Sequence, residues 1–262
     1  MNSVTSVAVD GRHDLDLAFK VSDAAARLAL AHFGTGLTTT LKADGTPVTE
    51  ADRAVERLLQ DMLSSARPED ALLGEEFGQV READRVWILD PIDGTSFFSC
   101  GDPNWRIHIA LQVAGTTELA VVTAPALERC WWAVRGGGSF ESAWPCEEGR
   151  ATRLAVSSTS SLGHAVLDAL DDESRGRLPS TAARAPRSAL PLVELVRGEI
   201  DGFLVECCHI WDHAPWILLV EESGGRFTDR TGGREGDRGG GLYSNANLHT
   251  QLLAALRYPI HP

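Results

Sequence analysis

The sequence is poor in the features that mark exported, membrane-spanning and nucleic-acid-binding proteins. Among its 262 residues are only five cysteines, an odd number without a CxxC spacing, which favours reduced thiols in a cytoplasm. No apolar run approaches the roughly 18 residues of a membrane-spanning helix, and no basic stretch followed by an apolar core opens the chain. Basic residues are outnumbered, 24 to 37, and the net charge of −13 argues against nucleic-acid and anionic-membrane partners. We therefore expect a cytoplasmic protein.

Apolar residues make up 43% of the chain, enough for a sizeable core in one large domain or two joined lobes, and no internal repeats occur. After a frayed leader at 1–12, the spacing of apolar residues predicts an amphipathic helix from Asp14 to about Gly34. A second helix opens at Thr49, where Asp52 completes the pattern of a capping box.

The rest of the chain alternates between strand and helix patterns. Successive apolar stretches separated by Gly or Pro turns predict an antiparallel meander, at Ile107–Val113, Leu119–Thr123 and Cys130–Val134. Farther along, the patterns predict strands at 154–156 and 202–206, helices at 188–196, 212–224 and 247–256, and a flexible loop at 231–241. Asp212 is the predicted N-cap of the middle helix.

The stretch Trp87–Phe98 is central, because a short apolar run there leads into a turn rich in Pro and Gly. Asp90 and Asp93 lie three residues apart across a proline, so both carboxylates can point into one small volume. Like charges so close repel unless a cation joins them, and Mg²⁺ prefers such oxygen ligands. Gly94 allows close backbone approach, and Thr95 offers a hydroxyl and an amide where a helix can start, which favours phosphate. The stretch indicates metal-assisted phosphoryl transfer, whereas the alternative is an Asp-rich turn that only closes a strand.

Other candidate residues have ordinary structural explanations. Glu75 and its acidic neighbour follow a predicted strand at 71–74 and are typical of solvated surface. The capping box accounts for Asp52. His209 and His213 stand four apart, a spacing that can serve zinc on a helix, but a helix start between them would place them on different faces. We therefore expect no zinc site.

Taken in order, five segments resemble the inositol monophosphatase-like family of Mg²⁺-dependent phosphomonoesterases. They are Pro47–Asp52, Gly74–Glu76, Asp90–Thr95, Trp211–Asp212 and Glu221–Gly225. Within the family the chain is most similar to the histidinol-phosphatase branch typical of actinobacteria, especially over Thr123–Gly138, and this likeness thins after about residue 150. The resemblance implies an α/β (α+β) fold, a layered αβαβα sandwich. It also implies an N-terminal α+β lobe at 1–150, with most metal ligands, and a C-terminal α/β lobe at 151–262.

The resemblance further implies a ligand set for two or three Mg²⁺ ions per active site. One ion would bind Glu75, Asp90 and the carbonyl of Ile92. A second would bind Asp90, Asp93 and Asp212, so that Asp90 bridges the two ions. Sensitivity to Li⁺ and a homodimer are implied as well.

Catalytic roles follow from the same resemblance. Asp52 would hold Thr95 so that its hydroxyl orients the attacking water, and Glu75 would assist in deprotonating that water. Phosphate would bind at Asp93 and at the amides of Gly94 and Thr95. Water would attack phosphorus in line, without a covalent phosphoenzyme.

The substrate implied first is L-histidinol phosphate, hydrolysed to L-histidinol and phosphate in histidine biosynthesis. Ala189, Glu206 and Asp212 fall where the family contacts the alcohol portion. Glu206 could attract an ammonium group or accept hydrogen bonds from hydroxyl groups, and an exposed acid at a strand end is an equal alternative. Lys42 matches a family position near the metal site, although an isolated lysine in a turn usually faces solvent.

Departures from the family pattern leave other substrates open. The family usually has Lys-Asn after Asp-Gly-Thr, whereas Ser96-Phe97 removes a positive charge beside the phosphate. Arg187 replaces a common glycine, Trp105-Arg106 replaces an apolar small-residue pattern, and the connector at 157–187 is short. Every proposed metal ligand is spared. The alternatives are phosphatases of inositol, sugar or cyclitol phosphates, of specialised metabolism or of bisphosphate nucleotides, and a non-catalytic metabolite-binding relative.

Overall fold

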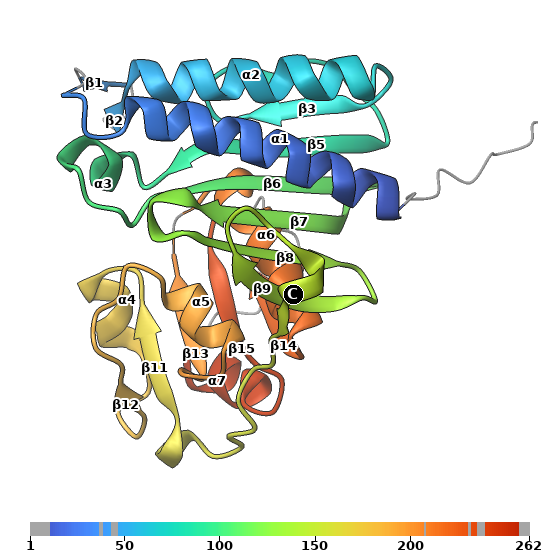
Figure 1. Ribbon diagram of the computed structural model, residues 1–262. Helices are drawn as coiled ribbons and strands as arrows, with labels where there is room; N and C mark the ends of the chain where they lie inside the picture. Colours follow the sequence, from blue (N-terminus) through green and yellow to red (C-terminus); the bar gives the residue numbers. More distant parts are fainter. Residues whose placement is uncertain are drawn as a thin grey trace, which may run out of the picture.

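The computed structural model describes residues 11–36, 39–42, 47–206, 208–229, 232–234 and 239–256, so nearly all of the expected leader and part of the loop at 231–241 lie outside the described residues. Two sheets are stacked, with helices outside and between them (Figure 1). The helices are α1 (Gly11–His32), α2 (Glu50–Ala66), α3 (Thr95–Cys100), α4 (Asp172–Arg177), α5 (Pro191–Val196), α6 (Ile210–Glu222) and α7 (His249–Leu256).

The larger sheet has eight strands in the order β10-β9-β8-β7-β6-β5-β3-β4. Its strands are β3 (Ala71–Gly74), β4 (Gly78–Gln79), β5 (Arg85–Asp93), β6 (Arg106–Val113), β7 (Thr116–Ala124), β8 (Arg129–Val134), β9 (Gly138–Ala143) and β10 (Thr152–Arg153). β3 pairs with β5 in parallel, and the other neighbours are antiparallel. The predicted meander at 107–134 is therefore confirmed, as is the capping box that opens α2.

The smaller sheet has five strands in the order β12-β11-β13-β15-β14. Its strands are β11 (Val166–Ala169), β12 (Ala183–Arg184), β13 (Gly202–Val205), β14 (Gly225–Asp229) and β15 (Gly241–Asn245). A separate hairpin joins β1 (Thr40–Leu41) to β2 (Pro47–Val48). The chain leaves the larger sheet at β10 and enters the smaller one at β11, and the division into two lobes near residue 150 stays a prediction.

The layer order follows from the alternation of side chains along the strands. On β7, Leu119 and Val121 pack in one apolar cluster with α1 and α2, whereas Ala120 and Val122 pack in another with α6. On the smaller sheet, Phe203 faces α6 and its neighbour Leu204 faces α7. Because strand residues alternate between faces, each sheet is covered on both sides. The predicted αβαβα sandwich is confirmed.

Several local predictions are wrong. The strand expected at 154–156 lies earlier, at β10, and the helix expected from 188 begins at Pro191, where proline suits the first helical turn. The connector at 157–187 contains β11, α4 and β12, which the sequence analysis did not predict. These elements are short, with two to six residues, so no periodicity could reveal them.

The expectation of reduced thiols is wrong for two cysteines. Cys130, at the start of β8, forms a disulfide with Cys146, which follows β9. The two Cα atoms are 5.7 Å apart, in the range that disulfides occupy. Spacing along the chain did not reveal this pairing, because it is the antiparallel contact of β8 with β9 that brings the two residues together.

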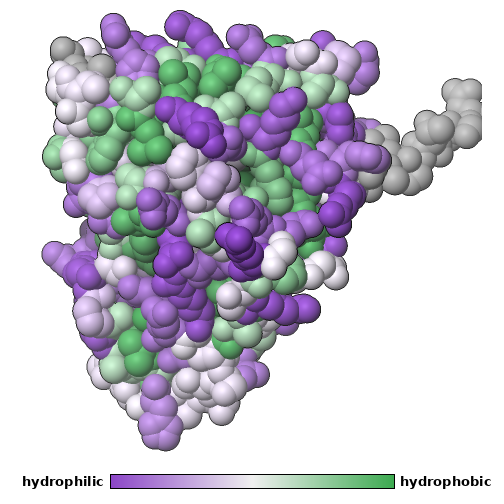
Figure 2. All heavy atoms as spheres, in the orientation of Figure 1, coloured by the Kyte–Doolittle hydropathy of each residue, from purple (hydrophilic) through white to green (hydrophobic). Residues whose placement is uncertain are grey.

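Hydrophilic and hydrophobic residues are interspersed over the face drawn in Figure 2. Within the described part of the chain, none of the helices combines the length and apolar character needed to cross a membrane.

Candidate active site

A bulge at the end of β5 brings Asp90 and Asp93 to the same side of the larger sheet. Residues three apart on a regular strand face opposite sides. Here Asp90 pairs with His108 and Asp93 with Arg106, so β5 holds one more residue than β6 between these pairs. The extra residue turns both carboxylates toward one face. The Ile92 amide donates to Asp90 Oδ1 at 3.0 Å and closes the turn.

Asp212 reaches the same point from α6, although it is not the N-cap that we predicted. The helix begins one turn earlier, at Ile210, with His209 as its N-cap. The His209 amide donates to Asp212 Oδ2 at 2.7 Å, the contact of an acid at the third helical position. This contact fixes the carboxylate at the helix start, and Asp212 can still face β5.

Asp90, Asp93 and Asp212 form a cluster of carboxylates, each offering an oxygen within 4.8 Å of the others. Burial, and then the charges of Glu75, Asp93 and Asp212, raise the pKa of Asp90 well above its usual range. Burial and the charge of Asp93 raise the pKa of Asp212 to about 7. Anionic oxygens forced together in this way are the donor set that hard divalent cations take, so these residues fit the predicted metal centre.

Glu75 lies beside this cluster, directly after β3, and its charge contributes to the raised pKa of Asp90. Lys42 donates to Glu75 Oε1 at 2.6 Å and lies 2.6 Å from Glu76 Oε1. Lys42 is therefore paired with two carboxylates rather than surrounded by solvent. Burial alone would lower its pKa, but Glu75 and Glu76 raise it above the usual value. The carbonyl of Ile92, the remaining expected ligand, accepts from the Thr95 hydroxyl at 3.1 Å.

Asp52 completes the capping box and also contacts Thr95, while its role in orienting the attacking water stays a prediction. Its Oδ2 accepts from the amide and hydroxyl of Thr49, at 2.7 and 2.6 Å, and completes the capping box of α2. Its Oδ1 accepts from the Thr95 hydroxyl at 3.1 Å. The two oxygens of one buried carboxylate thus link the start of α2 to the start of α3, where Gly94 is the N-cap with φ +85°.

Two residues of β6 belong to the site and were not assigned to it from the sequence. Arg106 Nε donates to Asp93 Oδ2 at 2.6 Å, and His108 Nε2 lies 3.4 Å from the same oxygen. Burial alone would raise the pKa of Asp93, but the charge of Arg106, a contribution from His108 and the hydrogen bond from Arg106 together hold that pKa below its usual value. Burial lowers the pKa of His108 to about 4, so its ring is neutral near pH 7. The sequence offered one signal for this role: Arg106 and His108 are polar residues two apart at the start of the strand that follows the carboxylate turn.

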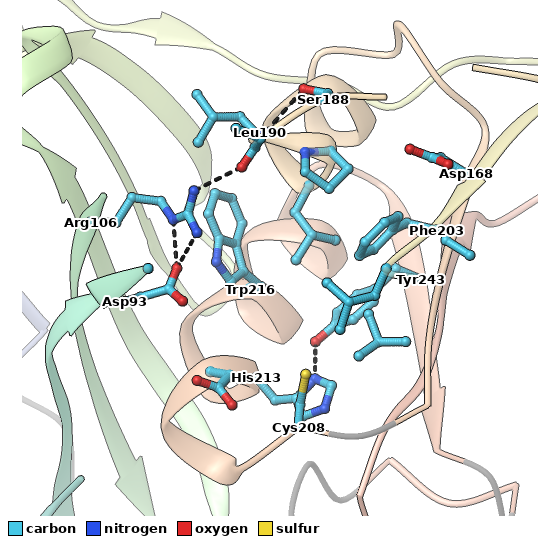
Figure 3. Close-up of a pocket in the computed structure, with 18 of the residues that line it drawn as sticks. Asp93, Arg106, Asp168, Ser188, Leu190, Phe203, Cys208, His213, Trp216 and Tyr243 are labelled. Carbon is cyan, nitrogen blue, oxygen red and sulfur yellow. Dashed lines mark hydrogen bonds and ion pairs between the residues drawn. The ribbon is translucent and has the colours of Figure 1, made fainter. Parts of the chain in front are cut away.

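A cavity of about 400 Å³ opens beside the carboxylates, between the two sheets and α6 (Figure 3). Much of its wall is apolar or aromatic, with Leu190, Leu192, Phe203, Val205, Trp216 and Tyr243. Some polar groups at the wall have partners: the Tyr243 hydroxyl bonds His213 Nδ1 at 2.5 Å, and Asp168 pairs with Arg175, whereas His213 Nε2 has no hydrogen-bond partner among the described residues. The cavity wall is thus largely apolar.

The residues expected to contact the alcohol portion do not all line the cavity. Ala189 lines the cavity, and its carbonyl accepts from Arg106 Nη1 at 2.9 Å. Glu206 does not line it, and its carboxylate accepts from Arg177 instead. The substrate-binding role of Glu206 stays a prediction. His209 stacks on Trp211, and His213 Nδ1 bonds the Tyr243 hydroxyl. The expectation that these histidines form no zinc site stays a prediction.

Comparison with known proteins relates the whole chain to one family. The family described as "Inositol monophosphatase family" matches residues 11–261. A Streptomyces griseus protein named glucose-1-phosphate thymidylyltransferase is 39% identical over 230 residues, covering 84% of this chain and 87% of its own length. The histidinol-phosphatase of Mycobacterium tuberculosis is 38% identical over 256 residues, covering 93% and 97%. The names of these relatives do not agree on one substrate.

Solved structures show the same fold. The Thermotoga maritima IMPase superposes with a TM-score of 0.80 at 29% identity, covering 93% of this chain and 96% of that chain. The extragenic suppressor protein suhB from Bartonella henselae gives 0.79 at 28% identity, covering 95% and 100%. Sequence, fold and the carboxylate cluster agree, and the chain therefore belongs to the inositol monophosphatase family of phosphatases.

Proposed function

We propose that this protein is a Mg²⁺-dependent phosphatase of small phosphate monoesters and that its substrate is L-histidinol phosphate. The observation that supports the proposal most is the cluster of Asp90, Asp93 and Asp212, whose oxygens lie within 4.8 Å of each other at the edge of a cavity large enough for a small alcohol. Relatives named histidinol-phosphatase are 34–38% identical over 93% of the chain.

The carboxylates would hold the cations, with Glu75 and the carbonyl of Ile92 completing the set. Divalent cations in such a site lower the pKa of a bound water and offset charge on phosphoryl oxygens. Burial and the charge of Asp93 raise the pKa of both Asp90 and Asp212, and these two carboxylates need such a counter-charge once they ionise. The distribution of ligands over two or three ions stays a prediction.

The residues around the cluster would orient the reactants. Thr95, held by Asp52, would direct the attacking water toward phosphorus, and Glu75 would accept the proton of that water. The amides of Gly94 and Thr95 would hold the phosphoryl oxygens. As the new P–O bond forms, the bond to the alcohol oxygen breaks, and the leaving alkoxide takes a proton from solvent. The products are the alcohol and inorganic phosphate.

The cavity favours histidinol over a polyol as the leaving alcohol. A polyol needs a hydrogen-bond partner for each of its several hydroxyl groups, whereas histidinol needs partners only for its ammonium group and two ring nitrogens, and burying an unpaired hydroxyl costs about 1–3 kcal/mol. The aromatic side chains of Phe203, Trp216 and Tyr243 suit a flat imidazole ring better. Inositol and sugar phosphates are the second candidates, since other relatives at 30–34% identity are named inositol-1-monophosphatase or fructose-1,6-bisphosphatase/inositol-1-monophosphatase.

A substrate panel tests both parts of the proposal. The purified protein is incubated with Mg²⁺ and with L-histidinol phosphate, myo-inositol 1-phosphate, sugar phosphates or a 3′-phosphorylated nucleotide, and released phosphate is measured. We expect the highest kcat/KM for L-histidinol phosphate. Asp93→Asn is the matched control, because it keeps the shape of the side chain and removes its charge. Turnover no higher than that of Asp93→Asn would overturn the phosphatase proposal, and preference for another ester would overturn only the substrate.

A further inference from the structure

The segment of residues 187–190, here called the wall segment, forms one side of the cavity. It belongs to neither sheet and precedes α5. Within it, the Leu190 amide donates to Ser188 Oγ at 3.0 Å, a contact that shapes the segment but does not position it. Its position therefore depends on contacts to other elements.

Arg187 joins the wall segment to the smaller sheet. Its Nη1 donates to the carbonyl of Ala169, at the end of β11, at 2.6 Å, and its Nη2 donates to Asp172 in α4. The same guanidinium lies 3.7 Å from Asp168. Hydrogen bonds of Arg187 thereby fix one end of the wall segment to β11 and α4, on the side of the cavity away from the carboxylate cluster.

Arg106 joins the same segment to the metal side. Its Nη1 donates to the carbonyl of Ala189 at 2.9 Å, while its Nε and Nη2 both contact Asp93 Oδ2 (Figure 3). The side chain is only 12% exposed, so water competes little for these contacts. Both contacts of Arg106 to this carboxylate use Oδ2. A single guanidinium thus connects a cluster carboxylate to the cavity wall.

We propose that Arg106 is a positioning residue that sets leaving-group specificity, by fixing the wall segment at a defined distance from Asp93. The inference rests on the proposed function. The carboxylate cluster places the phosphate, and the wall segment places the ring of the alcohol. Arg106 sets the distance between them, so it decides whether a large alcohol fits while phosphorus is in position. Misplacement by about 1 Å can cost 10²-fold in rate. The planar guanidinium of arginine carries five N–H donors and can contact Asp93 and the Ala189 carbonyl at once. A lysine ammonium on its flexible side chain does this less well.

The test compares two esters that differ only in the part facing the wall. L-Histidinol phosphate and 2-aminoethyl phosphate share the phosphate and the amine, but the second lacks the imidazolylmethyl group. The specificity ratio is kcat/KM for the first divided by kcat/KM for the second. A change confined to the metal centre lowers both values together and leaves the ratio unchanged.

The variants are Arg106→Gln, Arg106→Lys and a matched control, Arg135→Gln. Arg135 also joins a backbone carbonyl, that of Thr117, to a carboxylate, that of Glu221, but it does not line the cavity. We expect Arg106→Gln to lower the ratio by roughly tenfold, Arg106→Lys to lower it less, and Arg135→Gln to leave it unchanged. Hydrogen exchange at the amides of the wall segment should be faster in Arg106→Gln, without substrate or metal.

The possible outcomes separate the two proposals. An unchanged ratio in Arg106→Gln, or an equal fall with Arg135→Gln, would overturn the role of Arg106 while the phosphatase proposal stands. Failure of the unsubstituted protein to hydrolyse either ester would overturn the proposed substrate and with it the role of Arg106, whereas phosphate release from no ester of the wider panel would overturn the phosphatase proposal. If Arg106→Gln does not fold, Arg106→Lys decides, because it keeps the charge beside Asp93 and loses the fork.

Discussion

Replacing Asp212 by asparagine should stabilise the protein in the absence of metal. Burial and the charge of Asp93 raise the pKa of Asp212 from 3.8 to about 7, so ionising this side chain in the folded state is unfavourable. Asparagine has the same shape and no charge. Its amide oxygen can still accept from the His209 amide, which lies 2.7 Å from the carboxylate, so the start of α6 is kept.

The magnitude follows from the difference between the two pKa values, about three units, which corresponds to about 4 kcal/mol. The folded protein retains a proton that the unfolded chain has lost, so stability is full below pH 4 and falls as the pH rises through 7. We therefore expect metal-free Asp212→Asn to match the unsubstituted protein near pH 4. At pH 8.5 it should be more stable by up to about 4 kcal/mol, which corresponds to roughly 10 °C in Tm.

Thermal and denaturant unfolding measured from pH 4 to 8.5, with EDTA or with Mg²⁺, would check this expectation. Mg²⁺ should stabilise the unsubstituted protein strongly at pH 8.5 and the variant much less, because binding to the folded state adds stability. The reasoning would be refuted if the metal-free variant were less stable than the unsubstituted protein at pH 8.5, or if Mg²⁺ stabilised both equally.

Asp14→Asn is the control for this experiment. Asp14 is a buried carboxylate that Arg67 and Arg85 neutralise, with N–O distances of 2.9 and 3.0 Å, and it lies far along the chain from the cluster. Removing its charge should destabilise the protein by a few kcal/mol. The two substitutions therefore have effects of opposite sign on stability at high pH, although both replace an aspartate by asparagine.

Further predictions concern catalysis and the position of Glu75. Thr95→Ala should lower kcat about 10²-fold in initial-rate assays, whereas Thr95→Ser, which keeps the hydroxyl that Asp52 holds, should retain most activity. Glu56 accepts hydrogen bonds from the amides of Glu76 and Phe77 at 2.7 and 3.0 Å. Glu56→Ala should therefore destabilise the protein by roughly 1–3 kcal/mol in urea titrations and weaken Mg²⁺ binding in calorimetry. Unchanged stability and unchanged Mg²⁺ affinity would contradict this role. Li⁺ should inhibit phosphate release by competing at the cluster, and insensitivity up to high concentration would contradict that expectation.

The sequence predicted those parts of the fold and site that depend on local patterns. The layered sandwich and the family resemblance are confirmed, and the capping box at Thr49 follows from residues three apart. The place of Arg106 could not be predicted in this way. It depends on the register of β5 with β6 and on a bulge of one residue, and both are set by pairing across the sheet.

The start of α6 shows a different limit of local patterns. Aspartate is typical both of the N-cap and of the third helical position, and only the backbone contact to His209 distinguishes the two. The disulfide between Cys130 and Cys146 likewise needed the hairpin of β8 and β9 to be known.

The location of Asp212 on α6 makes metal affinity a measure of complete folding. Asp90 and Asp93 come from one strand early in the chain, whereas Asp212 comes from a helix that packs between the two sheets. A growing chain on the ribosome would hold the first two carboxylates long before the third. Tight binding of a cation would then be the last event of maturation, acquired only when the C-terminal third has docked.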